Sequence, residues 1–363
     1  MVYRRLFERR MTTPVRCGDV IIGGEAPVSI QTMTKCDTRD VESTVSEIRQ
    51  AVSHGAQIVR VAVVDKDAAR AIESIKNQVS CPVVADIHFD YNLALLSLEA
   101  GADKVRVNPG NLGGKEPLLK VAQKARSKGA AIRLGINSGS LERDILETYG
   151  APTPGAMVES ARRHLKHLED AGVDNVVLSL KSSSVKHTIE AYMMMAGFTK
   201  WPFHIGITEA GPGNHGVIKS AAGIGTLLAL GLGDTVRVSL TGPSSEEVEV
   251  AKQILQSVGL GFYGPDIISC PTCGRTQVDV VSVARQVSDA LKDVSLPLKV
   301  AVMGCPVNGP GEAREADIGV ACGRDGGILF ARGKVLGRVA SEQIVPALVR
   351  LAQQYAESPE GKN

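Results

Sequence analysis

Eight short hydrophobic runs, rich in β-branched residues, recur along the first two thirds of the chain and constrain its fold more than any other feature. Between successive runs lie segments in which apolar and charged residues repeat near the 3.6-residue period of a helix. The predicted strands are Val28–Met33, Gln57–Val63, Pro82–His88, Lys104–Asn108, Ala131–Asn137, Asn175–Lys181, Phe203–Glu209 and Thr235–Leu240. The predicted helices include Ser43–Ser53, Asp67–Asn77, Pro117–Lys128, Met157–Ala171 and Glu246–Ser257.

This alternation of strands and helices predicts parallel strand pairing, because a crossover helix returns the chain to the same edge of a sheet. Eight such units match the size of a (β/α)₈ barrel. A doubly wound open sheet is the alternative architecture, but no G-x-G-x-x-G motif follows the first predicted strand. The sequence therefore favours an α/β fold with an N-terminal TIM barrel.

Polar residues occupy alternate positions in several of these strands, so they share the face opposite the apolar residues. In a barrel that polar face points inward, toward the C-terminal mouth where barrel enzymes place their chemistry. Five cations are predicted to converge there: Arg60, Arg106, Arg133, Lys181 and Arg237. One arginine at a strand end is usually a structural ion pair, but burying five cations without anions would be costly. We therefore expect the mouth to bind phosphate or diphosphate, which arginine holds through bidentate hydrogen bonds.

Composition argues against several classes of protein. The formal charge of +2 is close to neutral, whereas a nucleic-acid-binding protein usually carries a clustered basic face. No apolar stretch is long enough to predict a membrane span. Seven cysteines in 363 residues do not make a disulfide scaffold, so we expect the chain to reside in the reducing cytoplasm.

The sequence pattern changes near residue 259, so we divide the chain into a barrel, 1–258, and a smaller α+β domain, 259–363. In the second domain, Cys270 and Cys273 are separated by two residues, which lets two thiolates face one metal centre. Cys305 follows a later strand, and Glu312 is the candidate for a fourth ligand. The predicted elements are a strand into Cys270, a helix Val278–Lys292, a strand Leu298–Met303, a hairpin Ile318–Val339 and a helix Glu342–Tyr355.

Three kinds of site fit these residues: structural zinc, a redox dithiol and an iron–sulfur cluster. A glutamate oxygen matches soft iron–sulfur chemistry poorly, so Glu312 would be an exchangeable ligand. A structural site prefers closed coordination, whereas a catalytic site keeps a replaceable position. Three cysteines with one labile glutamate therefore suggest a cluster that binds substrate.

The second domain carries the clearest resemblance to a known family, in the stretches Ile268–Thr276 and Gly304–Ala313. Both closely resemble the 4-hydroxy-3-methylbut-2-enyl diphosphate synthases of the methylerythritol phosphate route to isoprenoids. The barrel matches the same family in the segments Val84–Asp90, Arg106–Asn111 and Gly206–Gly211. The length fits the short bacterial form of the family.

The resemblance implies a 4Fe–4S cluster held by the positions that match Cys270, Cys273, Cys305 and Glu312. It also implies a two-electron reductive opening of 2-C-methyl-D-erythritol 2,4-cyclodiphosphate, with loss of water, to the allylic diphosphate. The substrate contacts that it implies are Arg60, Arg106, Asn108, Arg133, Asn137, Lys181 and Ser239, with Asn308 beside the cluster and substrate. Glu209 is implied as an acid or base near the ring. Because Glu209 differs in parity from the inward set of its strand, we expect a bend there.

No nicotinamide or flavin motif is visible, so we expect a ferredoxin or flavodoxin to supply the electrons. The resemblance further implies a head-to-tail homodimer in which the cluster domain of one subunit closes over the barrel of the other. Two other functions stay open on the residues alone. One is a non-redox barrel enzyme for a phosphate ligand with a structural zinc domain, and the other is an iron–sulfur sensor of a phosphorylated metabolite.

The sequence departs from the family pattern at three positions. Thr32 stands where the family usually has serine, and Cys36 and Cys322 stand where threonine and glycine are expected. None of these positions belongs to the implied ligand set. The two cysteines, together with Cys17 and Cys81, are expected to be packed or surface thiols.

Overall fold

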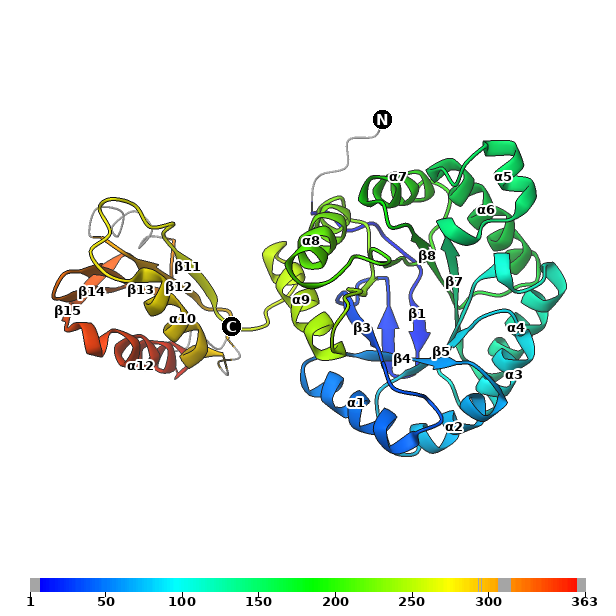
Figure 1. The fold of residues 1–363 in the computed structure, drawn as a ribbon, viewed down its shortest axis with the longest axis horizontal. Helices are drawn as coiled ribbons and strands as arrows, with labels where there is room; N and C mark the ends of the chain where they lie inside the picture. Colours follow the sequence, from blue (N-terminus) through cyan, green and yellow to red (C-terminus); the bar gives the residue numbers. More distant parts are fainter. Residues whose placement is uncertain (1–6, 293, 295, 306–314, 358–363) are drawn as a thin grey trace. The chain divides into compact units, whose positions relative to one another are not determined.

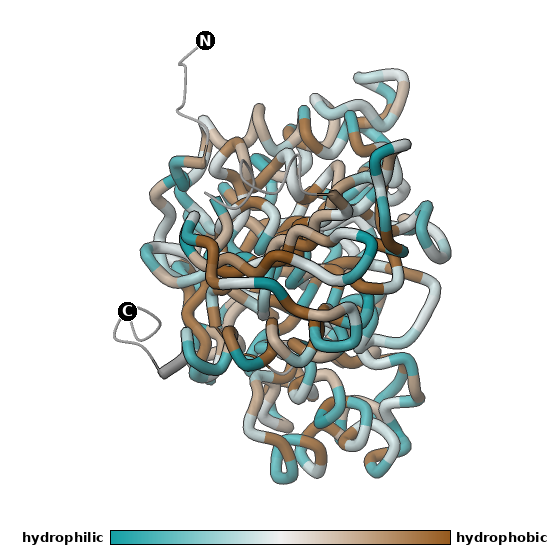
Figure 2. The backbone as a smooth tube through the Cα atoms, turned by 90° about the vertical axis from the view of Figure 1, so that its left-hand side faces the viewer, coloured by the Kyte–Doolittle hydropathy of each residue, from teal (hydrophilic) through white to brown (hydrophobic). Residues whose placement is uncertain are grey.

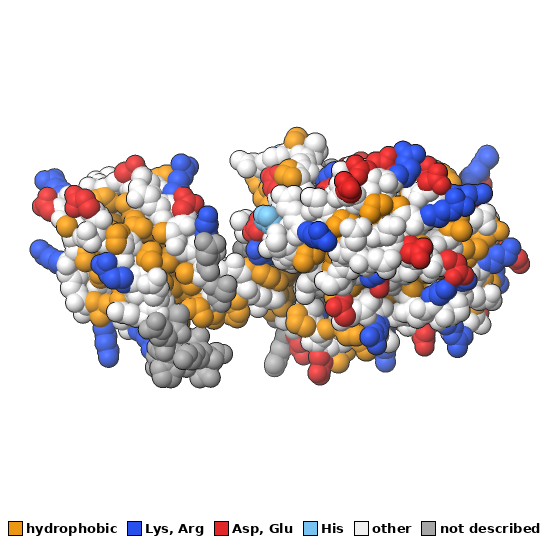
Figure 3. Space-filling model, turned by 90° about the horizontal axis from the view of Figure 1, so that it is seen from below, with side chains coloured by type: hydrophobic (Ala, Val, Ile, Leu, Met, Phe, Trp, Pro, Cys, Tyr) orange, Lys and Arg blue, Asp and Glu red, His pale blue; other side chains and the backbone are white. Residues whose placement is uncertain are grey.

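The computed structural model describes residues 7–292, 294, 296–305 and 315–357 (Figure 1). The chain divides into two compact units, 1–260 and 261–363. Positive and negative side chains are interspersed on the face that Figure 3 shows, as expected for a chain of nearly neutral charge.

The first unit is built around eight parallel strands. They are β3 (Ser29–Met33), β4 (Ile58–Val63), β5 (Val83–Ile87), β6 (Lys104–Val107), β7 (Ala131–Asn137), β8 (Val176–Lys181), β9 (His204–Ile205) and β10 (Thr235–Val236). Their order is β8-β7-β6-β5-β4-β3-β10-β9. A parallel bridge between Leu178 and Phe203 joins the two ends of this sheet, and the Leu178 N–H donates to the Pro202 carbonyl at 2.9 Å. The predicted barrel is confirmed.

Helices surround the strands, as Figure 1 shows. They are α1 (Val41–Ser53), α2 (Lys66–Lys76), α3 (Tyr91–Glu99), α4 (Lys115–Lys128), α6 (Pro154–Asp170), α7 (Val185–Met195), α8 (Gly213–Ala229) and α9 (Ser244–Ser257). A short α5 (Arg143–Tyr149) lies in the connection between β7 and α6. Several helices begin at a side chain that accepts a backbone N–H bond, namely Asp40, Asp65, Asp90, Thr153 and Ser184.

The last two strands are shorter than predicted. The runs expected over 203–209 and 235–240 keep regular strand geometry over two residues each. At the end of the first run, Glu209 has a φ of 51°, which the extended backbone of a strand excludes. Pairing nevertheless continues beyond β10, where the Arg237 N–H donates to the Ile205 carbonyl at 3.0 Å.

An N-terminal hairpin that the hydrophobic pattern does not predict closes the barrel at the end where its parallel strands begin. It consists of β1 (Val15–Cys17) and β2 (Val20–Ile22), paired antiparallel. The hairpin packs its buried side chains against the first inward residues of the barrel strands. This floor cluster contains Val15, Cys17, Ile22, Ile58, Val84, Ala131 and Val177. The chemistry of the barrel is therefore confined to its opposite, C-terminal end.

The described residues of the second unit form a five-stranded sheet with two α-helices. Its strands are β11 (Asp266–Ser269), β12 (Lys299–Met303), β13 (Ile318–Gly323), β14 (Gly326–Ala331) and β15 (Lys334–Val339), hydrogen-bonded in that order. The segment predicted as a hairpin over 318–339 therefore holds three strands, because a second reversal at Arg332 and Gly333 returns β15 along β14. Strands β11, β12 and β13 pair in parallel. Figure 2 shows hydrophobic and hydrophilic stretches alternating along the backbone.

The core of this unit lies between the sheet and the helices α10 (Val280–Leu291) and α12 (Ile344–Glu357). It contains Val287 and Leu291 from α10, Val300 and Val302 from β12, Val320 and Cys322 from β13, and Leu348 from α12. In the part of the chain that the structure describes, no helix has the length and apolar character needed to cross a bilayer.

The hairpin floor gives the first testable prediction. Ile22 is fully buried in the floor cluster, so Ile22→Ala removes packed methyl groups and should cost the barrel about 2–4 kcal/mol of unfolding free energy. Urea denaturation measures this loss. Its neighbour Ile21 is 42% exposed, and Ile21→Ala should change the stability by less than about 0.5 kcal/mol. Equal losses in the two variants would show that the hairpin is not a structural floor.

Candidate active site

The inward face of the barrel is polar above its floor. Inward positions of most barrels carry branched aliphatic side chains, which fill the interior in layers. Here several inward positions carry buried polar groups instead, among them Ser29, Gln31, Lys104, His204 and Thr235, and Lys104 pairs with the floor residues Val84 and Ala131. Burial and the nearby cations lower the pKa of His204 well below its usual range, so its imidazole is neutral. The polar layer therefore leads from a dry floor to a charged mouth.

The five predicted cations share one cavity of about 170 Å³ at the mouth. The residues that line it are Arg60, Asp86, His88, Arg106, Arg133, Gly135, Ile136, Asn137, Ser179, Lys181, Thr208, Arg237 and Ser239. Arg133 is only 2% exposed and Arg106 only 8%. Strand alternation therefore brings these cations together as the sequence pattern predicted. We call this cavity the cationic well.

Asp86 is the only carboxylate among the described residues that line the cationic well. Its Oδ1 lies 3.3 Å from Nη1 of Arg106 and 3.7 Å from Nη1 of Arg60, and its Oδ2 lies 3.4 Å from Nε2 of His88. Burial opposes ionisation of Asp86, but Arg60, His88 and Arg106 outweigh it and hold the pKa of its carboxyl well below the usual range. Among the described residues that line the cavity, one carboxylate thus stands against five cations.

The excess positive charge perturbs the cations themselves. Burial, reinforced by the neighbouring cations, lowers the pKa of Arg133 and of Lys181 well below the usual values. Among the described residues, Nε and Nη1 of Arg133 and Nε of Arg106 are buried without a hydrogen-bond partner. Unsatisfied buried donors are costly. A multiply charged anion in the cationic well would satisfy these donors and relieve the repulsion.

Two residues outside the predicted set hold arginines of the cationic well in place. The thioether sulfur of Met33 accepts from Nε and Nη2 of Arg60 at 3.1 and 2.9 Å. Glu247, buried at the start of α9, lies 3.6 Å from Arg237. It also accepts from Oγ1 of Thr32 at 2.9 Å, so threonine in place of the family's serine retains the hydroxyl that this contact needs. The sequence signal that could have identified Glu247 was an acidic residue in the first turn of a predicted helix.

Two inward glycines, also missed from the sequence, make room for cationic side chains. A Cβ at Gly135 would lie 2.8 Å from Nε of Arg106, and one at Gly206 would lie 2.8 Å from Nζ of Lys181. Each glycine has the inward parity of its strand, as Arg133 and Asn137 flank Gly135 on β7. That parity, read together with the missing side chain, was the signal that could have identified them.

A second cavity of about 340 Å³ adjoins the cationic well, and the two share His88, Arg106, Asn137 and Thr208. Its other lining residues are Asn108, Asn111, Ser138, Gly139, Ser140, Ser183 and Glu209. We call it the amide shelf, because amides and hydroxyls predominate. Glu209 is exposed, and its positive φ is a bend of the kind that the strand pattern required. Asn108 and Glu209 line the amide shelf, whereas Ser239 lines the cationic well.

In the second unit, strand pairing places two of the predicted cysteine ligands at neighbouring strand ends. Ser269 pairs with Val302, so Cys270 follows β11 close to the end of β12, where Cys305 lies. The Gly304 N–H donates to Sγ of Cys270 at 3.2 Å. A Cβ at Gly304 would lie 2.4 Å from Cγ2 of Val280 and 3.3 Å from that sulfur, so only glycine fits at this position.

Of the remaining predicted ligands, the structure describes Cys273 but not Glu312. Cys273 is exposed, and its N–H donates to Oγ1 of Thr276 at 2.9 Å. Asn308 and Glu312 lie outside the described residues. Within the described part of the chain, no three His, Cys, Asp or Glu side chains converge closely enough to hold a metal ion.

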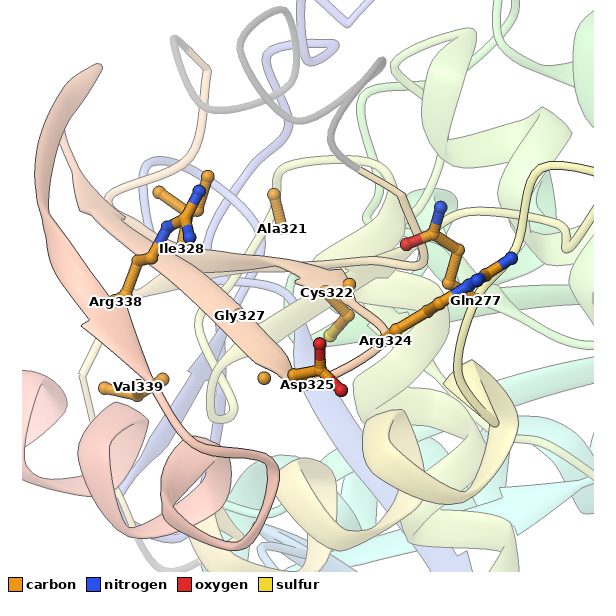
Figure 4. A pocket seen from close by; sticks show the side chains of 11 residues that line it. Gln277, Ala321, Cys322, Arg324, Asp325, Gly327, Ile328, Arg338 and Val339 are labelled. Carbon is orange, nitrogen blue, oxygen red and sulfur yellow. The ribbon is translucent and has the colours of Figure 1, made fainter.

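The thiols outside the predicted ligand set are unreactive by environment. Cys322 lies in the core on β13, and burial, with a smaller contribution from Cys270, raises its pKa to about 11. It borders a cavity of about 330 Å³ between Gln277 and the β13–β14 turn (Figure 4). Cys17 and Cys81 are also buried, and burial raises the pKa of both thiols. Cys36 is half-buried, and its sulfur lies 3.4 Å from Oγ1 of Thr44.

Comparison with known proteins matches both units. The model of the GcpE TIM-barrel domain matches residues 12–252, and that of the GcpE protein C-terminal domain matches residues 266–354. The chain belongs to the GcpE family.

Relatives in this family extend over nearly the whole chain. One from Brevibacillus brevis is 51% identical over 345 residues, covering 95% of this chain and 96% of the relative. One from Nitratidesulfovibrio vulgaris is 53% identical, covering 92% of this chain and 86% of the relative. One from Clostridium perfringens is 49% identical, covering 95% and 99%. Each is named 4-hydroxy-3-methylbut-2-en-1-yl diphosphate synthase (flavodoxin).

The space that Gly135 leaves in this GcpE-family barrel is testable. Gly135→Ala should displace the Arg106 guanidinium, the mobile end of a side chain, and weaken equilibrium binding of inorganic diphosphate by about tenfold or more. Isothermal titration calorimetry measures the affinity. Gly225→Ala on α8 is the matched control, because a Cβ there meets nothing within 4 Å, and it should bind like the wild type. An unchanged affinity in Gly135→Ala would argue against this role.

The ionisation of Lys104 makes the folding stability of the barrel depend on pH. It is fully buried, and burial first, then repulsion from Arg133 against the opposing influence of Cys17, lowers its pKa to about 8. The unfolded chain, in which lysine has a pKa of about 10.4, binds more protons between about pH 8 and pH 10, so this residue makes stability rise with pH there. Below about pH 8 the buried charge costs the folded state its full penalty.

Lys104→Met should therefore raise the unfolding free energy near pH 7, by up to about 3 kcal/mol, and the gain should shrink toward about pH 10. Urea denaturation of both proteins at several pH values measures it. The difference between the two proteins cancels the titration of groups that they share. A gain that does not depend on pH would mean that folding does not lower the pKa of Lys104.

Proposed function

We propose that this protein catalyses the two-electron reductive opening of 2-C-methyl-D-erythritol 2,4-cyclodiphosphate, with loss of water, to 4-hydroxy-3-methylbut-2-enyl diphosphate. The observation that carries the proposal is the cationic well, in which five cations and their unsatisfied donors face a single carboxylate. Membership in the GcpE family and the names of its relatives support the same reaction. A diphosphate has the charge and the acceptor oxygens that this cavity lacks.

The residues of the second unit fit an iron–sulfur centre in their chemistry. Cys270, Cys273 and Cys305 supply soft thiolate ligands, and the Gly304 N–H already donates to the Cys270 sulfur, as backbone donors do toward cluster ligands. Glu312 is the proposed fourth ligand. When bound, a 4Fe–4S cluster supplies electrons one at a time and a Lewis-acidic iron.

The barrel residues bind the substrate and stabilise charge as its ring opens. The reaction breaks a carbon–oxygen bond of the cyclic diphosphate and leaves an additional negative charge on the released phosphate oxygen. The arginines of the cationic well lie where that charge appears, and they are oriented before the reaction by Met33, Asp86 and Glu247. Preorganised donors of this kind stabilise developing charge without reorganising during the step. Glu209, exposed on the amide shelf, is the proposed acid or base near the carbon portion of the substrate.

A flavodoxin is the proposed electron donor, since the relatives carry that donor in their names. Ferredoxin is the alternative carrier. Seven free thiols support a reducing cytoplasm as the compartment. The head-to-tail homodimer implied by the family resemblance stays a prediction.

Anaerobic purification tests the proposal. The full chain should be brown and contain about four irons and four sulfides, with broad absorption near ~400 nm. It should convert the cyclic diphosphate when supplied with reduced methyl viologen. Cys273→Ser should lose colour and activity, while Cys36→Ser, the matched control away from the predicted ligands, should keep both. One zinc per chain and no colour after reconstitution would instead support a non-redox barrel enzyme with a structural zinc domain.

A further inference from the structure

Two turns that follow neighbouring strands form one wall of the amide shelf. Asn108 follows β6 and leads into a 3₁₀ turn, Pro109–Asn111, and Asn137 ends β7 and leads into a second 3₁₀ turn, Ser138–Ser140. Strands β6 and β7 pair in parallel, so both turns lie at the same end of the barrel. Asn108 is only 4% exposed, although its turn borders a cavity.

Ser140 joins the two turns through its hydroxyl. Its Oγ accepts from Nδ2 of Asn108 at 2.7 Å and donates to the Asn137 carbonyl at 3.3 Å. The first bond occupies the donor end of the Asn108 amide and thereby fixes which end stays available. Within the described residues, Oδ1 of Asn108 makes no hydrogen bond. The amide therefore offers an acceptor to the shelf.

The backbone of the two turns is also in close contact. A Cβ at Gly110 would lie 2.0 Å from the Ser140 carbonyl oxygen, closer than any side chain permits. Only glycine allows the turns to meet at this point, so their separation is fixed by steric contact as well as by the hydroxyl bridge. Neither the glycine nor the serine carries charge, and neither lines the cationic well.

We propose that Ser140 is a positioning residue that presents the Asn108 carbonyl oxygen to a hydroxyl group on the carbon portion of the substrate. This inference rests on the proposed function and divides the mouth between two tasks. The cationic well holds the diphosphate by charge, and the amide shelf recognises a hydroxylated carbon unit by oriented acceptors. Arg106 lines both cavities and marks the boundary between them.

The test compares equilibrium binding of two ligands, the cyclic diphosphate and inorganic diphosphate, to the full chain without reductant. Ser140→Ala frees the Asn108 amide to rotate and should weaken binding of the cyclic diphosphate about tenfold, while inorganic diphosphate binds within about twofold of wild type. Ser140→Thr retains the hydroxyl and should restore most of the affinity. The melting temperature of each variant checks that the fold is intact.

A double-mutant cycle separates positioning from general structural support. If Ser140 acts through Asn108, Ser140→Ala should have little further effect in an Asn108→Ala background. Additive losses, or equal losses for both ligands, would overturn the positioning role. Turnover with reduced methyl viologen tests the proposed function separately: a wild-type protein that binds the cyclic diphosphate without converting it contradicts the function alone. A wild type that does not bind the cyclic diphosphate contradicts both.

Discussion

Positive charge concentrated inside a closed barrel is the constraint on which the rest of this structure depends. Five cations share a cavity with one carboxylate, and Lys104 is buried below them in the same interior. Like charges that are withdrawn from water both repel one another and lose hydration, so the folded state bears this cost. The apolar floor and the outward faces of the strands, which bury aliphatic side chains against the helices, supply the opposing stability.

The residues that hold the arginines of the cationic well occupy only part of the hydrogen-bonding capacity of each guanidinium. Met33 offers a thioether, which is a weak acceptor, and Asp86 and Glu247 reach Arg106 and Arg237 at 3.3 and 3.6 Å. A closer bidentate carboxylate at every arginine would neutralise the well and compete with the ligand. The absence of a side chain at Gly135 leaves room for the Arg106 side chain, and it does so without adding a charge.

The sequence could predict the features that depend on local interactions along the chain. Strand alternation is a property of the backbone, so the residue pattern alone placed Arg60, Arg133 and Lys181 on one inward face. The hairpin floor and the Thr32–Glu247 contact join residues far apart in the chain, and no periodicity reports such pairs. Strand β15, the third strand of the segment 318–339, was missed because nearly all of its residues are solvent-exposed, so it lacks the alternation of a half-buried strand.

The cost of the charged interior has a chemical use. Opening the cyclic diphosphate at a carbon–oxygen bond creates negative charge on the released phosphate oxygen, so the field that destabilises the free protein becomes more favourable as the bond breaks. The bond that breaks joins the phosphate to the carbon unit, and in the binding mode that we propose it lies where the cationic well meets the amide shelf. Arg106, which lines both cavities and contacts Asp86, stands at that boundary. The diphosphate stays joined to the carbon chain through its other carbon–oxygen bond, so in this binding mode separate anchoring of the two portions lets the ring open while the whole molecule stays bound.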